Sequence, residues 1–433
     1  MFQTLKMAWK SPELRKKLLF TLWIIVVFRI GSVITVPFID PDMVKTWMDS
    51  NASNGNFLEY LNIISGGSLS KASIFALSIT PYINASIIIQ LLVFAIPPLE
   101  RLQHEGDEGR KRIGQITTVL TMALAAFMSF AYYVTLKNAN AVSFTEGGNG
   151  VFVAFVICGC FVAGSSLIVW LGGLVTKKGV GNGISIILFA GIVARYPSDI
   201  GVLWSEFLAN KSRYIVIMPI VAIVFIGMIT IIVLMNSAER RIPINYAKRV
   251  VGRKQFGGQS TFMPIKVLMS GVMPIIFAMS FMSLPSTIQL WKGVPTSTHG
   301  FYYWFCRAFS MQSWSYAVMY MILIVLFNYF YVSMQYNPVE IANQLRQNNG
   351  AIPGIRPGQP TAHYIQRILS KITFVGALFL GFIAIFPIFF SRIEGLETLT
   401  MGGTSMLIVV NVALDTVRQL ESQLIMRTHK GFL

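Results

Sequence analysis

Charged residues, cysteine and histidine are all scarce in this chain. Only 12% of its 433 residues are charged, about half the share of a soluble globular protein, whereas 54% are hydrophobic. The mean hydropathy is +0.62. Cys158, Cys160 and Cys306 are too few for a disulfide-stapled secreted protein, and we expect them to be small packing residues. The composition therefore excludes a soluble fold and indicates a polytopic membrane protein.

The sequence also contains no recognisable arrangement of catalytic or metal-binding residues. The histidines at positions 104, 299, 363 and 429 lack metal-ligand spacing, and the segment 66–71 lacks the glycine that a P-loop places before its lysine. Ion-coupled transporters usually keep ionisable residues inside the membrane, but here only Arg29 and Asp415 fall within apolar stretches. The sequence therefore predicts no enzyme, no metal site and no cofactor, and it weakens the case for a coupled small-solute transporter.

Apolar runs of spanning length recur along the chain and predict an all-α fold with ten transmembrane helices. These runs are residues 18–36, 76–96, 116–136, 151–174, 184–196, 214–235, 268–290, 315–335, 372–390 and 401–417. The basic segment 1–17 precedes a run of full span length, and no small-residue cleavage site follows. We therefore expect an amphipathic cytoplasmic helix there, not a signal peptide.

The distribution of charge supports ten spans. With a cytoplasmic N-terminus, the whole formal net charge of +17 lies on the cytoplasmic side, as the positive-inside rule requires. Ten spans divide into two halves of five, and because five is odd the halves would be inverted, with a central pore between them. The expected segments are a cytoplasmic helix 1–17, an N-terminal half 18–197, an outer loop 198–213, a C-terminal half 214–417 and a cytoplasmic tail 418–433.

Residues 57–75 interrupt the pattern of spans. They are moderately apolar but contain Glu59, Lys71 and the pair Gly66-Gly67, so the run is too polar and too broken to cross lipid. Irregular backbone at membrane depth is tolerated only inside protein or beside a water-filled cavity. We predict a half-helix that re-enters from the outer side; an ordinary outer surface helix is the alternative.

Two long cytoplasmic segments, 236–266 and 336–371, are predicted to dock a partner. The first is strongly basic, and its alternating apolar residues predict an extended hairpin that turns near residues 252–254. The second contains the run IPGIRPG (352–358), whose prolines and glycines predict a stiff, exposed tip around Arg356. Such loops suit anionic lipid, an acidic protein or RNA phosphate.

Eight runs of residues form recognisable motifs. They are SGGSLSKASIFALSITPYINASIIIQLL (65–92), EGDEGRKRIGQIT (105–117), KGVGNGISIILFAGIVARYP (178–197), ERRIPINYAKR (239–249), STFMPIKV (260–267), GVMPIIFA (271–278), IPGIRPG (352–358) and GGTSMLIVV (402–410). In this order the runs resemble the SecY family, the channel-forming subunits of the bacterial protein translocase. The resemblance implies a protein-conducting channel of the bacterial cytoplasmic (inner) membrane. Such a channel passes unfolded preproteins and releases transmembrane segments sideways through a lateral gate between the second/third and seventh/eighth spans.

The resemblance also implies roles for individual residues. It places a pore ring of branched aliphatic side chains, which would exclude ions by dewetting, at Ile83, Ile87, Ile184, Leu188, Ile276 and Ile408. Ile83 and Ile87 lie four positions apart and share one helix face, as do Ile184 and Leu188. Packing between spans is the alternative role for all six residues. It places a plug at residues 57–73, including Phe57, Tyr60, Ile64, Gly66, Gly67, Ser68 and Leu69.

Finally, the resemblance implies partners. These are the SecE and SecG subunits, the SecA motor, the ribosome, preproteins with their signal sequences, and anionic lipids; the motor, the ribosome or the proton-motive force would supply the energy. The implied docking residues are Arg240, Arg241, Lys248, Arg249, Arg253, Lys254 and Arg356. Two other classes remain open: a secondary transporter would need a polar site at the midplane, and an insertase or scaffold without a through-pore would need no plug.

Overall fold

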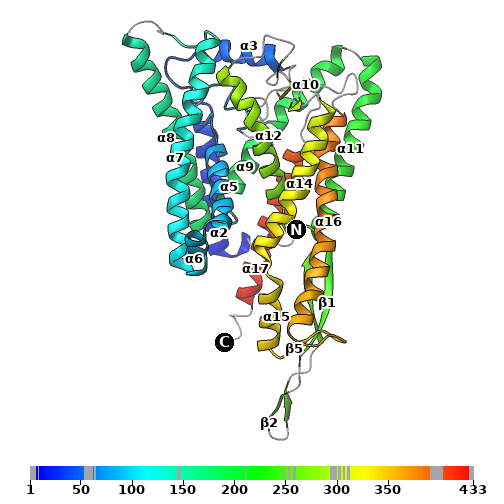
Figure 1. Ribbon diagram of the computed structural model, residues 1–433. Coiled ribbons are helices and arrows are strands. Elements are labelled where there is room, and N and C mark those ends of the chain that lie inside the picture. Colours follow the sequence, from blue (N-terminus) through cyan, green and yellow to red (C-terminus); the bar gives the residue numbers. More distant parts are fainter. Residues whose placement is uncertain are drawn as a thin grey trace. The chain divides into compact units, whose positions relative to one another are not determined.

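The protein is mostly helical, as the composition predicts (Figure 1). The computed structural model describes residues 6–7, 9–52, 62, 65–143, 148–209, 211–246, 249–251, 254–256, 260–292, 300, 304–305, 308–309, 313–390 and 403–428. Its helices are α2 (Pro12–Gly31), α3 (Pro41–Ala52), α5 (Thr80–Ala95), α6 (Pro97–His104), α7 (Asp107–Asn138), α8 (Gly148–Lys178), α9 (Gly183–Val193), α10 (Tyr196–Ala209), α11 (Lys211–Ser237), α12 (Met273–Lys292), α14 (Trp314–Gln335), α15 (Pro338–Gln347), α16 (Gln359–Phe390) and α17 (Gly403–Thr428).

Each of the ten predicted apolar stretches overlaps one of these helices. In the described part of the chain, six helices are long and apolar enough to cross a membrane, or seven if the bent pair α5–α6 forms one span. That pair bends by 107° at Ile96, where the chain is extended. The bend follows from Pro97 and Pro98, because proline disfavours helical backbone in the residue before it and cannot donate a helical hydrogen bond.

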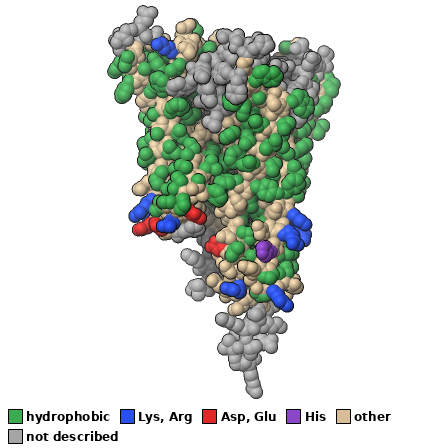
Figure 2. Space-filling model, viewed as in Figure 1, with side chains coloured by type: hydrophobic (Ala, Val, Ile, Leu, Met, Phe, Trp, Pro, Cys, Tyr) green, Lys and Arg blue, Asp and Glu red, His purple; other side chains and the backbone are tan. Residues whose placement is uncertain are grey.

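The surface of the helices is apolar along most of their length. On the face shown in Figure 2, hydrophobic side chains cover the helices and charged side chains gather at their ends. Exposed large residues on α8, for example, include Val151, Phe155 and Trp170. Exposed apolar patches of this extent are rare on soluble proteins and suit contact with lipid or partner subunits.

The chain forms two compact units. The first contains Met1–Val216, Ser280–Tyr316 and Ile408–Leu433, and the second contains Ile217–Met279 and Ala317–Leu407. One hydrophobic core cluster of the first unit lies between α7, α8 and the segments that precede α5. A small antiparallel sheet distinguishes the second unit.

The strands confirm the predicted hairpin. β4 (Ser260–Lys266), β1 (Glu239–Tyr246) and β5 (Gly350–Ala351) form a three-stranded sheet in this order, and β2 (Arg249–Val251) and β3 (Lys254–Phe256) form a separate two-stranded sheet. β1 pairs with β4 from Glu239↔Lys266 to Asn245↔Ser260, and β2 pairs with β3 beyond it. The predicted turn includes residues 252–253, which lie outside the described residues, as does Lys248.

A half-helix is predicted within residues 57–75; of the described residues there, Asn62 is helical but residues 65–75 are not, so the prediction is wrong for residues 65–75. Residues 65–79 form consecutive turns interrupted by one bridging residue. Gly66 and Gly67 adopt φ values of 67° and 82°, which favour glycine and stop a right-handed helix. Phe57, Tyr60 and Ile64 lie outside the described residues.

Candidate functional site

The turn segment 65–79 of the first unit satisfies much of its own hydrogen bonding. Four serine hydroxyls donate to carbonyl oxygens of residues 62–68 at 2.8–3.2 Å: Ser65, Ser68, Ser70 and Ser73. The side chain of Asn62 also accepts a hydrogen bond from the backbone N–H of Ser70 at 3.1 Å. Serine and asparagine compete with helical hydrogen bonds in this way, which explains the irregular backbone in an apolar stretch.

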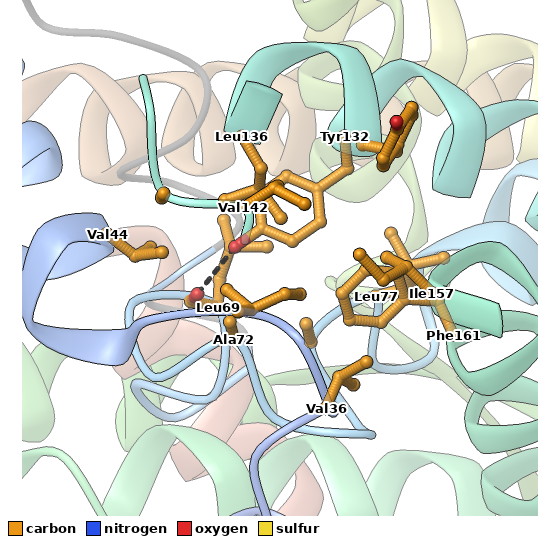
Figure 3. Close-up of a cluster of buried hydrophobic side chains, with 14 of the residues drawn as sticks. Val36, Val44, Leu69, Ala72, Leu77, Tyr132, Leu136, Val142, Ile157 and Phe161 are labelled. Carbon is orange, nitrogen blue, oxygen red and sulfur yellow. Dashed lines mark hydrogen bonds between the residues drawn. The ribbon is translucent and has the colours of Figure 1, made fainter. Parts of the chain in front are cut away.

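Apolar packing holds this segment against the two long helices α7 and α8 (Figure 3). Leu69, Ala72 and Leu77 lie in one buried cluster with residues from both helices. The helix residues labelled in Figure 3 are Tyr132, Leu136, Ile157 and Phe161. The hydroxyl of Tyr132 donates to the carbonyl oxygen of Leu69 at 2.8 Å, and this bond joins residues far apart in the sequence.

The segment also approaches other helix backbones closely. A Cβ atom at Gly66 would lie 2.5 Å from the carbonyl oxygen of Gly191 in α9, so only glycine fits this contact. The guanidinium of Arg29, predicted as a charge inside the first span, donates to the carbonyl oxygen of Gly66 at 3.5 Å. Phe75 stacks on Phe28 of α2 with ring centroids 5.8 Å apart. The segment therefore contacts α2, α7, α8 and α9 of the same unit.

The residues predicted to form the pore ring are all at least partly buried. Ile83 and Ile184 are half-buried, whereas the other members are at most 8% exposed: Ile87, Leu188, Ile276 and Ile408. Ile276 belongs to the second unit and the other five to the first. Burial agrees with both interpretations, pore ring and packing between spans, so the ring stays a prediction.

Two threonines from neighbouring helices hold the connection 179–183, which leads into α9. The backbone N–H of Val180 donates to Oγ1 of Thr21 in α2 at 3.2 Å, and the N–H of Gly183 donates to Oγ1 of Thr176 in α8 at 2.9 Å. Neither threonine stands out in the sequence, because each lies in or beside an apolar run. Together with the N-cap Asn182, whose side chain accepts a hydrogen bond from the N–H of Ile184 at 3.1 Å, the two bonds hold the start of α9 in place.

We expect Gly183→Ala to displace α9 and the residues Ile184 and Leu188 that it carries. A Cβ atom at Gly183 would collide with the backbone carbonyl oxygen of Gly172, which cannot rotate away. Overpacking of this kind costs about 1–3 kcal/mol, so the unfolding temperature of the detergent-solubilised protein should fall. Gly173→Ala is the matched control, since its Cβ would meet nothing within 4 Å. Equal melting temperatures for the two variants would contradict the packing described here.

In the second unit, the two segments predicted to dock partners form one platform. β1 lies between β4 and β5, so the hairpin and the segment after α15 share a sheet. Ile242 and Ile244 of β1 are buried in one cluster with Ile352 and Ile365 of the second segment. The sequence does not indicate that these two loops pair, because pairing between distant strands leaves no local signal.

The structure describes the side chains of only some of the predicted docking residues. Arg240 and Arg241 are exposed on β1, and Arg241 donates to the carboxylate of Glu239 at 2.8 Å. Arg249 and Lys254 lie on β2 and β3, where only their backbone is described. Lys248 and Arg253 lie outside the described residues.

The tip around Arg356 is exposed and held at both ends, as predicted. Ile352, just before the tip, is buried at 4% exposure, and its carbonyl oxygen accepts a hydrogen bond from the N–H of Ile355 at 3.1 Å. On the other side, the hydroxyl of Thr361 donates to the carbonyl oxygen of Arg356 at 2.9 Å. The guanidinium therefore projects from a short, braced turn.

Comparisons with known proteins identify the family. A family model described as SecY matches residues 73–417. A protein translocase subunit SecY of Streptomyces scabiei is 40% identical over 435 residues, which cover 98% of each chain. The chain belongs to the SecY family. A protein translocase subunit SecY of Thermotoga maritima is 38% identical over 441 residues, covering 100% of this chain and 98% of the relative.

Solved structures share the SecY fold. A protein-conducting channel superposes with a TM-score of 0.66 at 22% identity, covering 96% of this chain and 94% of the other. A channel of a canine ribosome–channel complex from the endoplasmic reticulum superposes with a TM-score of 0.62 at 21% identity, with the same coverage. SecY proteins are non-enzymatic, multi-pass inner-membrane subunits of the protein translocase, so the predicted family, function and location are confirmed.

Among the described residues, no group of three or more His, Cys, Asp and Glu could hold a metal ion.

Proposed function

We propose that this translocase subunit forms the pore itself, through which unfolded preproteins cross the membrane, and that a lateral gate releases transmembrane segments into lipid. The observation that carries this proposal is the turn segment 65–79, which is buried among long apolar helices of the first unit. Irregular backbone in such surroundings is tolerated where protein encloses it or where a water-filled pathway lies beside it. A plug that closes a pore meets both conditions.

We also propose ten membrane crossings in two inverted halves, 18–197 and 214–417, with a cytoplasmic helix 1–17, an outer loop 198–213 and a cytoplasmic tail 418–433. Helices at all ten apolar stretches support this count. Three of these helices are not among those long and apolar enough to span a membrane: α2 and α17, which each contain several charged residues, and α12, which is counted over Met273–Met282 as a shorter apolar helix. Charged ends next to an apolar stretch agree with a helix that leaves the membrane on the cytoplasmic side.

The proposed pore consists of the plug, residues 57–73, and a ring of aliphatic side chains. The ring residues are Ile83, Ile87, Ile184, Leu188, Ile276 and Ile408. The close contact between Gly66 and Gly191 supports this arrangement, because it puts the plug segment directly beside α9, the helix that carries Ile184 and Leu188. Aliphatic side chains at a constriction exclude ions by dewetting but can move aside for a polypeptide.

Deleting residues 57–73 should raise the ion conductance of the resting channel while preprotein export continues. The physical reason is that the segment fills space between helices that remain joined by their own contacts, notably α5 with α7 and α7 with α8. Planar-bilayer recording of the assembled translocase is the test. Unchanged resting conductance would contradict the plug, and saturable flux of a small solute would indicate a transporter instead.

For partners, we propose that the platform in the second unit docks the SecA motor and the ribosome, and that SecE, SecG and anionic lipids contact the chain elsewhere. The exposed Arg240 and Arg356 lie on segments that share one sheet and one core, which supports a common docking surface. Arginine suits both acidic protein groups and RNA phosphate, because its guanidinium can bind either in a bidentate way. Affinity purification of the chain with its bound partners tests this assignment.

A further inference from the structure

The contacts that hold the plug segment divide into two kinds. Hydrogen bonds within the segment, such as those of Ser65, Ser68 and Ser70, join residues that would move together. Other bonds join the segment to its surroundings and would have to break or bend when it moves. The hydroxyl of Tyr132 makes a bond of the second kind, to the carbonyl oxygen of Leu69.

The position of Tyr132 is well determined by packing. Its side chain is 5% exposed, and its ring lies 5.3 Å from the ring of Phe161 on α8, tilted by 54° (Figure 3). Leu69 is 1% exposed, so the hydrogen bond lies away from water. A hydroxyl held in this way has little freedom to choose another acceptor.

The two ends of this bond are affected differently when it breaks. The carbonyl oxygen of Leu69 also accepts a hydrogen bond from the N–H of Ala72 at 2.9 Å, within the same segment. The departing segment therefore keeps a partner for that carbonyl. The hydroxyl of Tyr132, which stays on α7, loses the acceptor that it has in the closed arrangement.

We propose that Tyr132 is a positioning residue that helps to latch the plug shut, and that its single hydroxyl limits how often the resting plug opens. The proposal rests on the plug assignment made above and deepens it by naming one side-chain contact that resists opening, in addition to the hydrogen bonds from Arg29 to Gly66 and from the N–H of Val36 to the carbonyl oxygen of Ala72. Nothing in the sequence signals this role, since Tyr132 lies within an apolar run and resembles an ordinary packing residue.

Tyr132→Phe removes the hydroxyl and keeps the ring. Loss of a typical intramolecular hydrogen bond should destabilise the closed arrangement of the plug. The open population of the resting plug should therefore rise roughly 2- to 12-fold. The probe is a cysteine at Ser68, which is fully buried, in a background where Cys158, Cys160 and Cys306 are replaced by alanine. We would measure its rate of modification by a membrane-impermeant maleimide added from the outer side, with the translocase complex in proteoliposomes.

Tyr133→Phe is the matched control. Tyr133 is the next residue of α7 and is buried in the same cluster, and among the described residues it makes no hydrogen bond with the plug segment. We expect the modification rate of Ser68→Cys to rise with Tyr132→Phe and to stay within about twofold of the parent with Tyr133→Phe, the lower limit expected for loss of one hydrogen bond.

Three outcomes separate the latch from a structural role and from the plug itself. A lower unfolding temperature for Tyr132→Phe with an unchanged modification rate would overturn the latch, because the bond would then only stabilise the fold. An equal rise in both tyrosine variants would overturn it as well. If Ser68→Cys reacts no faster when an arrested preprotein occupies the channel, the plug assignment fails; if it does react faster but Tyr132→Phe has no effect at rest, only the latch fails.

Discussion

Arg356→Glu should abolish motor-driven preprotein export while the protein still inserts, folds and assembles. The tip is braced by the buried Ile352 and by the hydroxyl of Thr361, so it presents one guanidinium at low entropic cost. Reversing the charge at a partner's contact puts like charges together, whereas the exposed position of Arg356 leaves the fold unaffected. The measurement is ATP-dependent export of a preprotein into vesicles with matched amounts of channel.

Arg112→Glu is the control for this experiment. Arg112 is an exposed arginine on α7 of the first unit, so the variant makes the same change in net charge outside both predicted docking segments. Arg356→Lys should also be clearly defective, because lysine cannot bind carboxylate or phosphate in a bidentate way. Export at the normal rate by Arg356→Glu would show that this arginine is only a turn residue, and the docking surface would then be limited to the 236–266 hairpin.

Polar substitutions in the pore ring should make the resting channel leak ions. Asparagine in place of Ile83, Ile87, Ile276 or Ile408 gives water hydrogen-bonding partners at the constriction, which opposes dewetting. If each pair of substitutions removes about 1.4 kcal/mol from the barrier, conductance should rise about tenfold per pair. Export should continue, and preproteins with defective signal sequences should pass more easily. The measurement is ion flux through the resting translocase in proteoliposomes.

Ile88→Asn is the control for the ring. Ile88 is the residue after Ile87 on α5 but is 37% exposed, so it points in another direction. Its substitution adds the same polar group without changing the constriction. A channel with several ring substitutions that leaks no more than the Ile88→Asn variant would show that the six residues only pack between helices.

The sequence was sufficient to predict the elements whose signals are local. Long apolar runs predicted the positions of ten helices, since burial of apolar side chains and internal backbone hydrogen bonding depend on nearby residues. Alternating residues around Ile242 and Ile244 predicted the hairpin in the same way. The run 352–358 predicted a braced tip, because proline and glycine restrict or permit backbone angles wherever they occur.

Contacts between residues distant in the sequence leave no local signal. The Gly66-Gly67 pair showed that the segment after residue 57 is interrupted, but not that residues 65–79 would form turns bonded through their own serines. The positive φ angles of Gly66 and Gly67 and the serine hydrogen bonds favour turns locally. The contacts with α7, α8 and α9 join residues far apart in the sequence, so the local sequence does not show where the turns pack.

The sequence by itself therefore determined the membrane class, the family, the helix positions and the exposed tip around Arg356, because each depends on composition, periodicity or a contiguous motif. Only the tertiary structure decided that Tyr132 bonds to Leu69, that Thr21 and Thr176 hold the start of α9, and that the segments 236–266 and 336–371 share one sheet. The physical reason is that each of these contacts joins atoms from separate elements. The sequence shows which hydroxyls and strand edges can form hydrogen bonds, but it does not show which partner each of them meets in the folded protein.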